Sequence, residues 1–284
     1  MNILIAGNTG VIGSYLNKQD RFANSLVLNS KIVDLTSKEE IFSYARKIEK
    51  FNVLIFLVGL AHKKGKGQEL DEFRRVNKQT LVNLLSILEE ENKIPDKIIF
   101  ASTISVYGEK INQNVYNEVS DTKPFSPYAI TKLEAEEYLL NNFSNQSWIL
   151  RFAPVYASNF QLNINRRTKI GGWFYKVGSG SKKLSLCNLE NIGSAVQGII
   201  DDKVSAGIYN ISDENEYSYD NLLHYVNAKW IVRIPTFLVK GLFYIGKMMN
   251  NIFLKENATK LISDNIFSSD KIRKYISLTA SLNE

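Results

Sequence analysis

The sequence has very few of the residues that build disulfides and zinc centres. Cys187 is the only cysteine among 284 residues, so no intrachain disulfide can form and a metal site with two cysteines is excluded. His62 and His224 are the only histidines, too few to suggest a zinc centre. We therefore expect no metal site. The hydrophobic content of 44% is enough to bury a large core.

The sequence pattern predicts neither a secretion signal nor a basic recognition element. Met1–Ala6 is already an apolar segment of the kind that forms a core strand, with no basic segment and cleavable apolar run before it. The net charge of +6 comes from lysines scattered along the chain, apart from a small cluster at His62–Lys66. We interpret the cluster as a solvated loop, and the alternative is that it steers an anionic ligand. We therefore expect a cytoplasmic protein that does not bind nucleic acid.

A glycine-rich turn, Gly7-Asn8-Thr9-Gly10-Val11-Ile12-Gly13, follows the strand predicted at Met1–Ala6 and precedes residues that can open a helix. Gly7 permits a tight turn, Gly10 lets the backbone approach a pyrophosphate, and Gly13 allows the helix to pack against the strand. The N–H groups at the start of the helix would bind phosphates. The glycine spacing is wider than in the commonest dinucleotide fingerprint, and a purely structural turn is the alternative.

A second motif, Tyr128-Ala129-Ile130-Thr131-Lys132, lies far downstream. On a helix, Tyr128 and Lys132 share a face, so the ammonium can lie close to the phenol. An adjacent cation lowers a tyrosine pKa from about 10 and makes proton exchange with a hydroxyl feasible. Ser126 and Pro127 suit the start of that helix. On spacing alone, an ordinary surface pair is the alternative.

Hydroxyl side chains follow a third apolar strand, predicted at Lys97–Phe100. They are Ser102, Thr103 and Ser105, at the strand end where open α/β sheets place their chemistry. The three motifs in this order resemble those of the extended short-chain dehydrogenases/reductases, within the NAD-dependent nucleotide-sugar epimerase/dehydratase family. The resemblance runs from Met1 to about Ile276. The variants Gly59-Leu60-Ala61-His62 and Glu190-Asn191-Ile192 are similar to those of bacterial, UDP-glucose 4-epimerase-like members that serve surface-polysaccharide pathways.

The resemblance implies which residues form the site. The catalytic residues would be Tyr128 as acid/base, Lys132 and Thr103. Cofactor contacts would come from Gly7, Thr9, Gly10, Val11, Ile12, Gly13, Asp34, Leu35, Leu57, Val58, Gly59, Asn77, Tyr128, Lys132, Pro154 and Val155. Contacts to a nucleotide-diphosphate sugar would come from Ser102, Ser105, His62, Asn159 and Arg166.

Two departures from the family pattern narrow the chemistry. Dehydratases carry an Asp-Glu pair directly after the catalytic threonine, whereas Ile104 and Ser105 follow Thr103 here. This difference argues against a 4,6-dehydratase. An arginine that often contacts the nucleotide diphosphate is replaced by Leu184, and its substitute would be Lys182, Lys183, Arg166 or Arg167.

The choice of cofactor stays open between NAD and NADP. NAD-selective sites usually place Asp or Glu at the end of the second strand to hold the ribose hydroxyls, and Val27–Lys31 offers neither. Lys31 could meet a 2′-phosphate, or it is simply solvated. We expect NAD, with NADP as the alternative.

Strand and helix signals alternate from Met1 to about Val155 and predict an α/β fold with a doubly wound, Rossmann-type parallel sheet. Residues 1–156, with about 186–211, would form the dinucleotide-binding domain. Residues 157–185 and 212–284 would form a smaller C-terminal substrate-binding lobe. The split follows from the return of the 207–211 strand to the main domain.

Apolar residues recur at helical spacing through 237–253, while Lys240 and Lys247 fall elsewhere on the helix. Pro235 and the interior lysines argue against a membrane span. We expect this amphipathic helix to pack in the lobe. Its alternative is an interfacial membrane helix, or docking to a membrane-bound glycosyltransferase.

The function expected from the resemblance is a nucleotide-sugar 4-epimerase that acts on a UDP-hexose or UDP-N-acetylhexosamine by hydride transfer at C4. A reductase of a 4-keto nucleotide sugar would use every one of the same residues. A cofactor-binding scaffold or sensor without catalysis is a third hypothesis, against which intact Tyr128, Lys132 and Thr103 argue. The resemblance also implies a homodimer, paired through helices at about 76–91 and 128–142.

Overall fold

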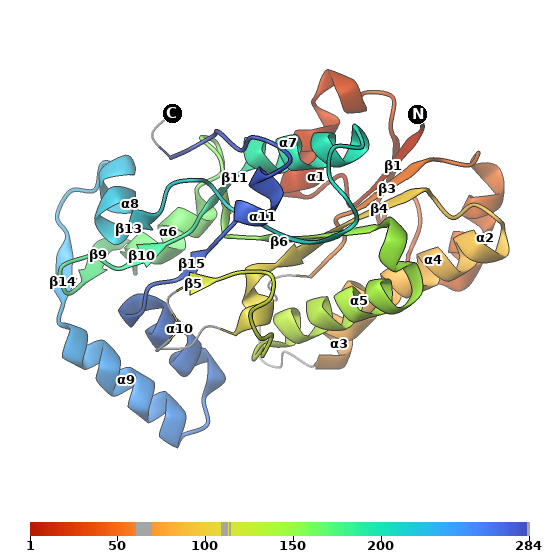
Figure 1. The fold of residues 1–284 in the computed structure, drawn as a ribbon. Helices are drawn as coiled ribbons and strands as arrows, with labels where there is room; N and C mark the ends of the chain where they lie inside the picture. The colour runs from red at the N-terminus through yellow and green to blue at the C-terminus, as the bar shows by residue number, and fades with distance from the viewer. Residues whose placement is uncertain (61–69, 109–112, 114, 283–284) are drawn as a thin grey trace. The chain divides into compact units, whose positions relative to one another are not determined.

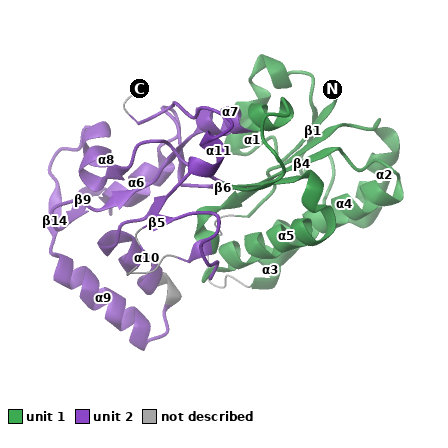
Figure 2. Ribbon diagram, in the orientation of Figure 1, with its two compact units in different colours: residues 1–106, 124–151, 196–209 green, residues 107–123, 152–195, 210–284 purple. Residues whose placement is uncertain are grey.

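The computed structural model describes residues 1–60, 70–108, 113 and 115–282, and these form two compact units (Figures 1 and 2). Unit 1 comprises Met1–Val106, Pro124–Arg151 and Val196–Tyr209. Unit 2 comprises Tyr107–Lys123, Phe152–Ala195 and Asn210–Glu284. The chain therefore passes from one unit to the other several times. The domain boundaries expected from the sequence stay a prediction.

Unit 1 is built on a six-stranded sheet with the order β12-β6-β4-β3-β1-β2. Its strands are β1 (Ile3–Ala6), β2 (Leu26–Leu28), β3 (Val53–Phe56), β4 (Lys97–Thr103), β6 (Ser147–Phe152) and β12 (Gly207–Ile211). β1 pairs in parallel with both β2 and β3, and β3 pairs in parallel with β4. The strand order reverses at β1, and ligands of open α/β sheets bind at such a switch point. The predicted doubly wound α/β fold is confirmed.

Helices carry the crossovers, because parallel strands cannot be joined by a tight hairpin. They are α1 (Val11–Asn17), α2 (Lys38–Lys47), α3 (Leu70–Arg74), the π-helix η2 (Arg75–Gln79), α4 (Thr80–Glu90), α5 (Pro127–Phe143) and α7 (Leu189–Ile200). Short 3-10 turns lie at η1 (Asp20–Phe22), η3 (Ile104–Tyr107) and η4 (Ser144–Gln146). The Ser126 hydroxyl accepts the Ala129 N–H at the start of α5, so the predicted helix start is confirmed.

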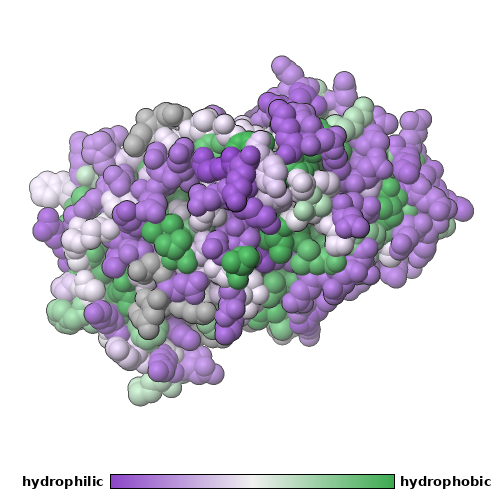
Figure 3. Space-filling view, in the orientation of Figure 1, coloured by the Kyte–Doolittle hydropathy of each residue, from purple (hydrophilic) through white to green (hydrophobic). Residues whose placement is uncertain are grey.

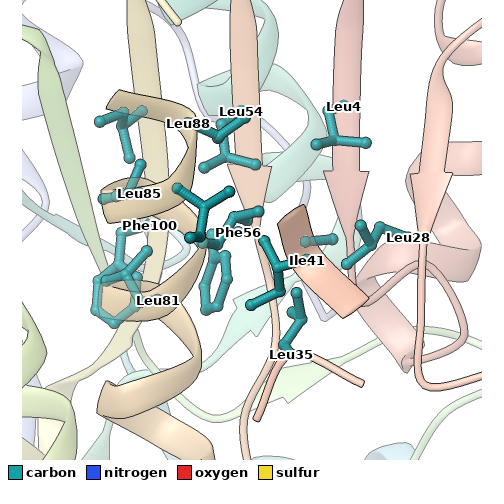
Figure 4. Packing of buried hydrophobic residues seen from close by; sticks show 14 of the residues in the cluster. Leu4, Leu28, Leu35, Ile41, Leu54, Phe56, Leu81, Leu85, Leu88 and Phe100 are labelled. Atoms are coloured by element: carbon teal, nitrogen blue, oxygen red, sulfur yellow. The ribbon is translucent and has the colours of Figure 1, made fainter. Parts of the chain in front are cut away.

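The main hydrophobic core of unit 1 lies between the sheet and the helices α2, α4 and α5 (Figure 4). The rings of Phe56 on β3 and Phe100 on β4 stack with their centroids 6.2 Å apart. Each fully buried side chain of this size contributes about 1.5–3 kcal/mol, so this layer holds the strands and their ends in place. The residues labelled in Figure 4 are Leu4, Leu28, Leu35, Ile41, Leu54, Phe56, Leu81, Leu85, Leu88 and Phe100.

Unit 2 consists of short strands and helices. Its strands form a sheet β14-β9-β8 and the pairs β10-β13, β11-β7 and β15-β5. They are β5 (Val115–Tyr116), β7 (Val155–Tyr156), β8 (Lys169–Ile170), β9 (Trp173–Val177), β10 (Lys183–Leu184), β11 (Cys187–Asn188), β13 (Tyr217–Ser218), β14 (Val232–Ile234) and β15 (Ile266–Phe267). Its helices are α6 (Leu162–Thr168), α8 (Tyr219–Tyr225), α9 (Thr236–Met248), α10 (Ile252–Ile262) and α11 (Asp270–Arg273). The amphipathic segment predicted at 237–253 forms α9 and the start of α10.

A buried carboxylate ties the short strands of unit 2 together. Asp213 accepts hydrogen bonds from the hydroxyls of Tyr156 at 2.7 Å and Tyr217 at 3.0 Å. It also accepts the side-chain amide of Asn191 at 2.8 Å and the N–H of Asn188 at 2.7 Å. Burial raises the pKa of Asp213, and these four donors offset the lost solvation of its charge.

The single cysteine, Cys187, lies on β11 and is completely buried. Its thiol is 3.7 Å from the carbonyl oxygen of Asn188, and burial raises its pKa well above the usual value. Across the described ranges, no cluster of His, Cys, Asp and Glu side chains could hold a metal ion. In the same ranges, no helix has the length and apolar character to cross a membrane.

Candidate active site

The glycine turn packs directly against the end of the neighbouring strand β3. Gly7 follows β1 with a φ of +92°, and a Cβ on it would lie 3.0 Å from the carbonyl carbon of Leu57. A Cβ on Gly13 would lie 2.3 Å from the carbonyl oxygen of Gly7. Both positions therefore require glycine for the turn's own geometry, Gly7 for its conformation and both for close backbone contact.

Gly10 differs from the other two glycines of the turn. Its backbone is extended, with φ −73° and ψ 172°, so any residue could adopt this conformation. A Cβ on Gly10 would meet only the carbonyl oxygen of Gly7, at an ordinary contact distance of 3.5 Å. Neither strain nor packing explains the glycine, whereas close approach of a ligand to the backbone does. Thr9, Val11 and Ile12 flank this position, and contacts of these residues with the pyrophosphate of a dinucleotide stay a prediction.

Two asparagines meet where β1 and β2 end. The side-chain amide of Asn29, directly after β2, donates to the side-chain oxygen of Asn8 at 2.9 Å. Asn29 therefore occupies the position where NAD-selective sites usually carry an acid, and it is hydrogen-bonded to a residue of the glycine turn. The sequence showed that the acid is missing but gave no sign of this partnership.

Asp34 and Leu35 lie in the loop between β2 and α2. The Asp34 carboxylate is exposed and accepts the N–H of Thr36 at 2.8 Å, and hydrogen bonds from Thr36 lower its pKa. Leu35 is buried, and its carbonyl oxygen accepts the side-chain amide of Asn83 at 3.2 Å. The acid thus shapes its own loop, and contacts of these residues with an adenine stay a prediction.

Asn77, in the π-helix η2, is completely buried and holds the segment after β3 in place. Its side-chain oxygen accepts the N–H of Leu60 at 2.6 Å. Its amide donates to the carbonyl oxygen of Leu60 at 3.2 Å and to the hydroxyl of Thr131 on α5 at 3.0 Å. These bonds fix Leu60 beside α5. A contact of Asn77 with a cofactor stays a prediction.

The structure brings Tyr128, Thr103 and Ser105 together at the end of β4. Tyr128 lies in the first turn of α5, where the side chain of Thr103 acts to lower the pKa of its phenol. The Thr103 hydroxyl also accepts the N–H of Ser105 at 3.2 Å. The backbone of the following turn therefore holds the Thr103 hydroxyl, and the same side chain influences the phenol of Tyr128.

Lys132 lies one turn after Tyr128 on α5 and is buried. Its ammonium donates to the carbonyl oxygens of Ala101 at 2.9 Å and Val58 at 3.2 Å. A Cβ on Gly59 would lie 3.0 Å from the same nitrogen, so the glycine leaves room for it. Lys132 thereby links α5 to the ends of β3 and β4.

The pKa values of Tyr128 and Lys132 are shifted mainly by burial. Burial raises the pKa of Tyr128 to about 12, and the hydrogen bond with Thr103 offsets this only in part. The sequence led us to expect a lowered value. The reason for the difference is the burial of the phenol itself, and burial likewise lowers the pKa of Lys132 to about 7, so this amine is only partly charged near neutral pH. Tyr128 is therefore a protonated phenol at neutral pH, able to donate a proton.

A buried ion pair, which the sequence analysis missed, lies beneath these residues. Glu136, one further turn along α5, accepts hydrogen bonds from Arg151 on β6 at 3.1 Å and 2.6 Å and from the hydroxyl of Ser102. The negative charge of Glu136 raises the pKa of Lys132 against the effect of burial. The signal was present, since Tyr128, Lys132 and Glu136 recur every four residues on one helix face.

The residues expected to bind substrate are dispersed over both units. Ser102 is buried in unit 1 with its hydroxyl engaged by Glu136, whereas Ser105 is only partly buried. Asn159 and Arg166 are exposed in unit 2, between β7 and α6 and on α6 respectively. His62, with its lysine cluster, lies outside the described residues.

The alternative cations for a diphosphate differ in their surroundings. Lys183 forms an ion pair with Glu216 at 2.7 Å, and Lys182 lies 3.7 Å from Asp264. Arg167 donates to the carbonyl oxygen of Asn163 at 2.9 Å.

Pro154 precedes β7 and Val155 is its first residue, where the Val155 carbonyl oxygen accepts the side-chain amide of Asn163 at 2.8 Å.

Comparison with known proteins identifies relatives of this fold. The model of the NAD dependent epimerase/dehydratase family matches residues 3–211. Among curated proteins, no sequence matched the chain.

Solved structures similar to the chain include both epimerases and reductases. UDP-glucose 4-epimerase of Thermotoga maritima, with UDP-glucose, aligns at a TM-score of 0.67 and 20% identity over 83% of this chain and 86% of that one. UDP-glucuronic acid 4-epimerase of Bacillus cereus, with NAD, aligns at a TM-score of 0.69 and 18% identity over 99% of this chain and 93% of that one. dTDP-4-dehydrorhamnose reductase of Bacillus anthracis, with NADP, aligns at a TM-score of 0.65 and 18% identity over 82% of this chain and 84% of that one. At these identities the likeness concerns the fold.

Proposed function

Because the chain belongs to the NAD dependent epimerase/dehydratase family, we propose that it is a nucleotide-sugar 4-epimerase using NAD(P). The proposed substrate is a UDP-hexose or UDP-N-acetylhexosamine for surface polysaccharide synthesis in the cytoplasm. The observation that carries the proposal is that Tyr128 and Thr103 act on each other at the end of β4, with Lys132 one turn along α5. Nicotinamide chemistry at a sugar carbon needs an acid/base of this kind.

The proposed roles follow from the contacts of each side chain. A bound nicotinamide dinucleotide supplies the acceptor and donor of hydride at sugar C4. Tyr128 would take the proton of the 4-hydroxyl and later return it, while Thr103 holds the same oxygen by a hydrogen bond. Lys132 would bind the cofactor's ribose and bias the charge of the phenol. For inversion, the 4-keto sugar must turn over in the site before C4 is reduced on its other face.

A reductase of a 4-keto nucleotide sugar is the second candidate. It is favoured by the raised pKa of Tyr128, about 12, because a reductase needs a proton donor at the 4-oxygen as hydride arrives. Asn29 at the end of β2, in place of an acid, is also compatible with the 2′-phosphate of NADP.

The first experiment is native mass spectrometry of the purified protein, followed by incubation with UDP-glucose and UDP-N-acetylglucosamine. Products are followed by NMR and reduced nicotinamide by absorbance. Retained NAD, C4 inversion and no net absorbance change support the epimerase. If the protein consumes NADPH with a 4-keto UDP-sugar and inverts C4 of neither UDP-sugar, the reductase replaces the epimerase as the proposed function.

The Tyr128→Phe variant separates both enzymes from a non-catalytic scaffold. Loss of the acid/base should lower turnover by at least about 10²-fold while the cofactor still binds. Tyr138→Phe, on the same helix but outside the site, is the matched control and should keep its turnover. If Tyr128→Phe turned over as fast as the control, Tyr128 would not be the acid/base.

A further inference from the structure

Helix α9 in unit 2 has one buried face and one exposed face. Val239 and Gly246 are buried on the first, where Val239 packs with Tyr175, Val177 and Ala258. The opposite face is exposed yet apolar, with Phe237 71% and Met248 82% accessible. We call it the α9 face, and its residues are Phe237, Leu238, Leu242, Tyr244, Ile245 and Met248.

The α9 face inverts the usual pattern of a surface helix. With 3.6 residues per turn, its six residues fall on one side, where a soluble protein normally presents charged or polar groups. A Cβ added at Gly241, on the same side, would meet no described atom within 4 Å. In Figure 3, hydrophobic and hydrophilic surface mix at the lower left, where Figure 1 draws α9, while the right side over α2 is mainly hydrophilic. Exposed apolar side chains gathered on one face of a helix are typical of an interaction site.

The chain segment that contains α9 carries side-chain charge of a single sign. Between Asp220 and Glu256 the sequence contains no acidic residue. The same stretch carries Lys229, Arg233, Lys240, Lys247 and Lys255. Lys240 and Lys247 are exposed and, seven positions apart, lie along the same flank of α9. A partner for this face must therefore be apolar at its centre and negatively charged around it.

We propose that the α9 face docks on a membrane surface that contains anionic lipids. Such a surface accepts apolar side chains between its acyl chains and basic side chains at its headgroups. The 13 residues of α9 are fewer than the roughly 20 that span a bilayer, so the helix lies along the interface. A second copy of the chain fits less well, because a two-fold contact through this face would bring like charges together.

The test is co-sedimentation of the full-length protein with phosphatidylglycerol/phosphatidylcholine vesicles and with pure phosphatidylcholine vesicles. We expect binding to the first, weakened by salt because the basic flank contributes. In Phe237→Glu/Met248→Glu the ratio of bound to free protein should fall by about tenfold or more. The control Ile32→Glu/Val119→Glu makes the same change of charge at exposed apolar residues elsewhere and should bind as wild type does.

A second variant protects the test against misfolding. Lys240→Glu/Lys247→Glu leaves the apolar residues intact and should also lose binding, with an unchanged circular dichroism spectrum and melting temperature. The proposal is overturned if wild type stays in the supernatant with anionic vesicles, or if the α9 variants bind as the control does. If wild type binds no vesicles, and light scattering shows a dimer that the α9 substitutions dissociate, the α9 face binds a second copy of the chain instead.

Discussion

Lys132 couples the protonation of the site to the stability of the fold. Burial lowers its pKa from 10.5 to about 7, with Glu136 acting in the opposite direction. Between these two values the unfolded chain holds a proton that the folded chain does not, so the free energy of unfolding rises with pH through this window. The amine thus stabilises the fold best when neutral, although its charged form is the one that acts on a neighbouring phenol.

The first prediction compares wild type with Lys132→Met in denaturant titrations from pH 7 to pH 10. As the pH rises, the unfolding free energy of wild type should increase relative to that of the variant by up to about 1 kcal/mol per pH unit. Parallel profiles would mean that Lys132 keeps an ordinary pKa in the folded chain.

A second prediction at this scale separates the glycines of the turn. Gly10→Ala should keep the melting temperature of wild type, because its Cβ meets only an ordinary contact, yet weaken NAD(P) binding by about tenfold or more in calorimetry. Gly13→Ala should lower the melting temperature, because its Cβ would lie 2.3 Å from a backbone oxygen. Equal dinucleotide affinity of Gly10→Ala and wild type would remove Gly10 from the site.

Single residues were the hardest level to predict from sequence. The spacing of Tyr128 and Lys132 gave the shared helix face, but the direction of the phenol's pKa shift depends on how deeply both groups are buried. The pairing of Asn29 with Asn8 depends on the register of β1 and β2, which no local motif encodes.

Helix α5 combines chemistry and support on one face at the scale of elements. Glu136 pairs with Arg151 inside unit 1, where both side chains are almost completely buried. Removing one partner leaves the other as an uncompensated buried charge, which typically costs about 3–5 kcal/mol. Replacing both side chains by uncharged ones removes the ion pair without leaving an uncompensated buried charge.

The third prediction is a double-mutant cycle on this pair. Glu136→Gln should lower the unfolding free energy by about 3 kcal/mol, and Glu136→Gln/Arg151→Met should recover a large part of the loss. Denaturant titration measures both. Additive losses in the double variant would show that the two side chains act independently.

Elements with strong local signals were predicted well. The apolar run before the glycine turn forms β1, and the Ser126-Pro127 start opens α5. The segment at 237–253 has a helical period, but periodicity alone cannot tell which face turns inward. In α9 the broad apolar face is exposed and the narrow side with Val239 and Gly246 is buried.

At the scale of the whole molecule, the resemblance implies a homodimer paired through residues 76–91 and 128–142. These residues correspond in the structure to most of η2 with α4, and to most of α5. Leu140 on α5 is a partly exposed apolar side chain within the second range.

The fourth prediction is a dimer of twice the 32.3 kDa chain mass in light scattering coupled to size exclusion. Leu140→Arg should shift the population towards monomer, because a charge would enter the apolar contact. Leu26→Arg, at an almost equally exposed leucine on β2, should leave the dimer intact. A monomeric wild-type protein would contradict the expectation.

The burial of Cys187 makes the protein a convenient background for site-specific labelling. The thiolate is the form of cysteine that attacks maleimide reagents, and it is scarce at a buried thiol of raised pKa. A cysteine introduced at an exposed position such as Met248 or Val119 would therefore react first, with no need to remove the natural one. A polarity-sensitive dye at residue 248 would then report contact of α9 with lipid in the wild-type charge background, and the same dye at residue 119 would be its reference.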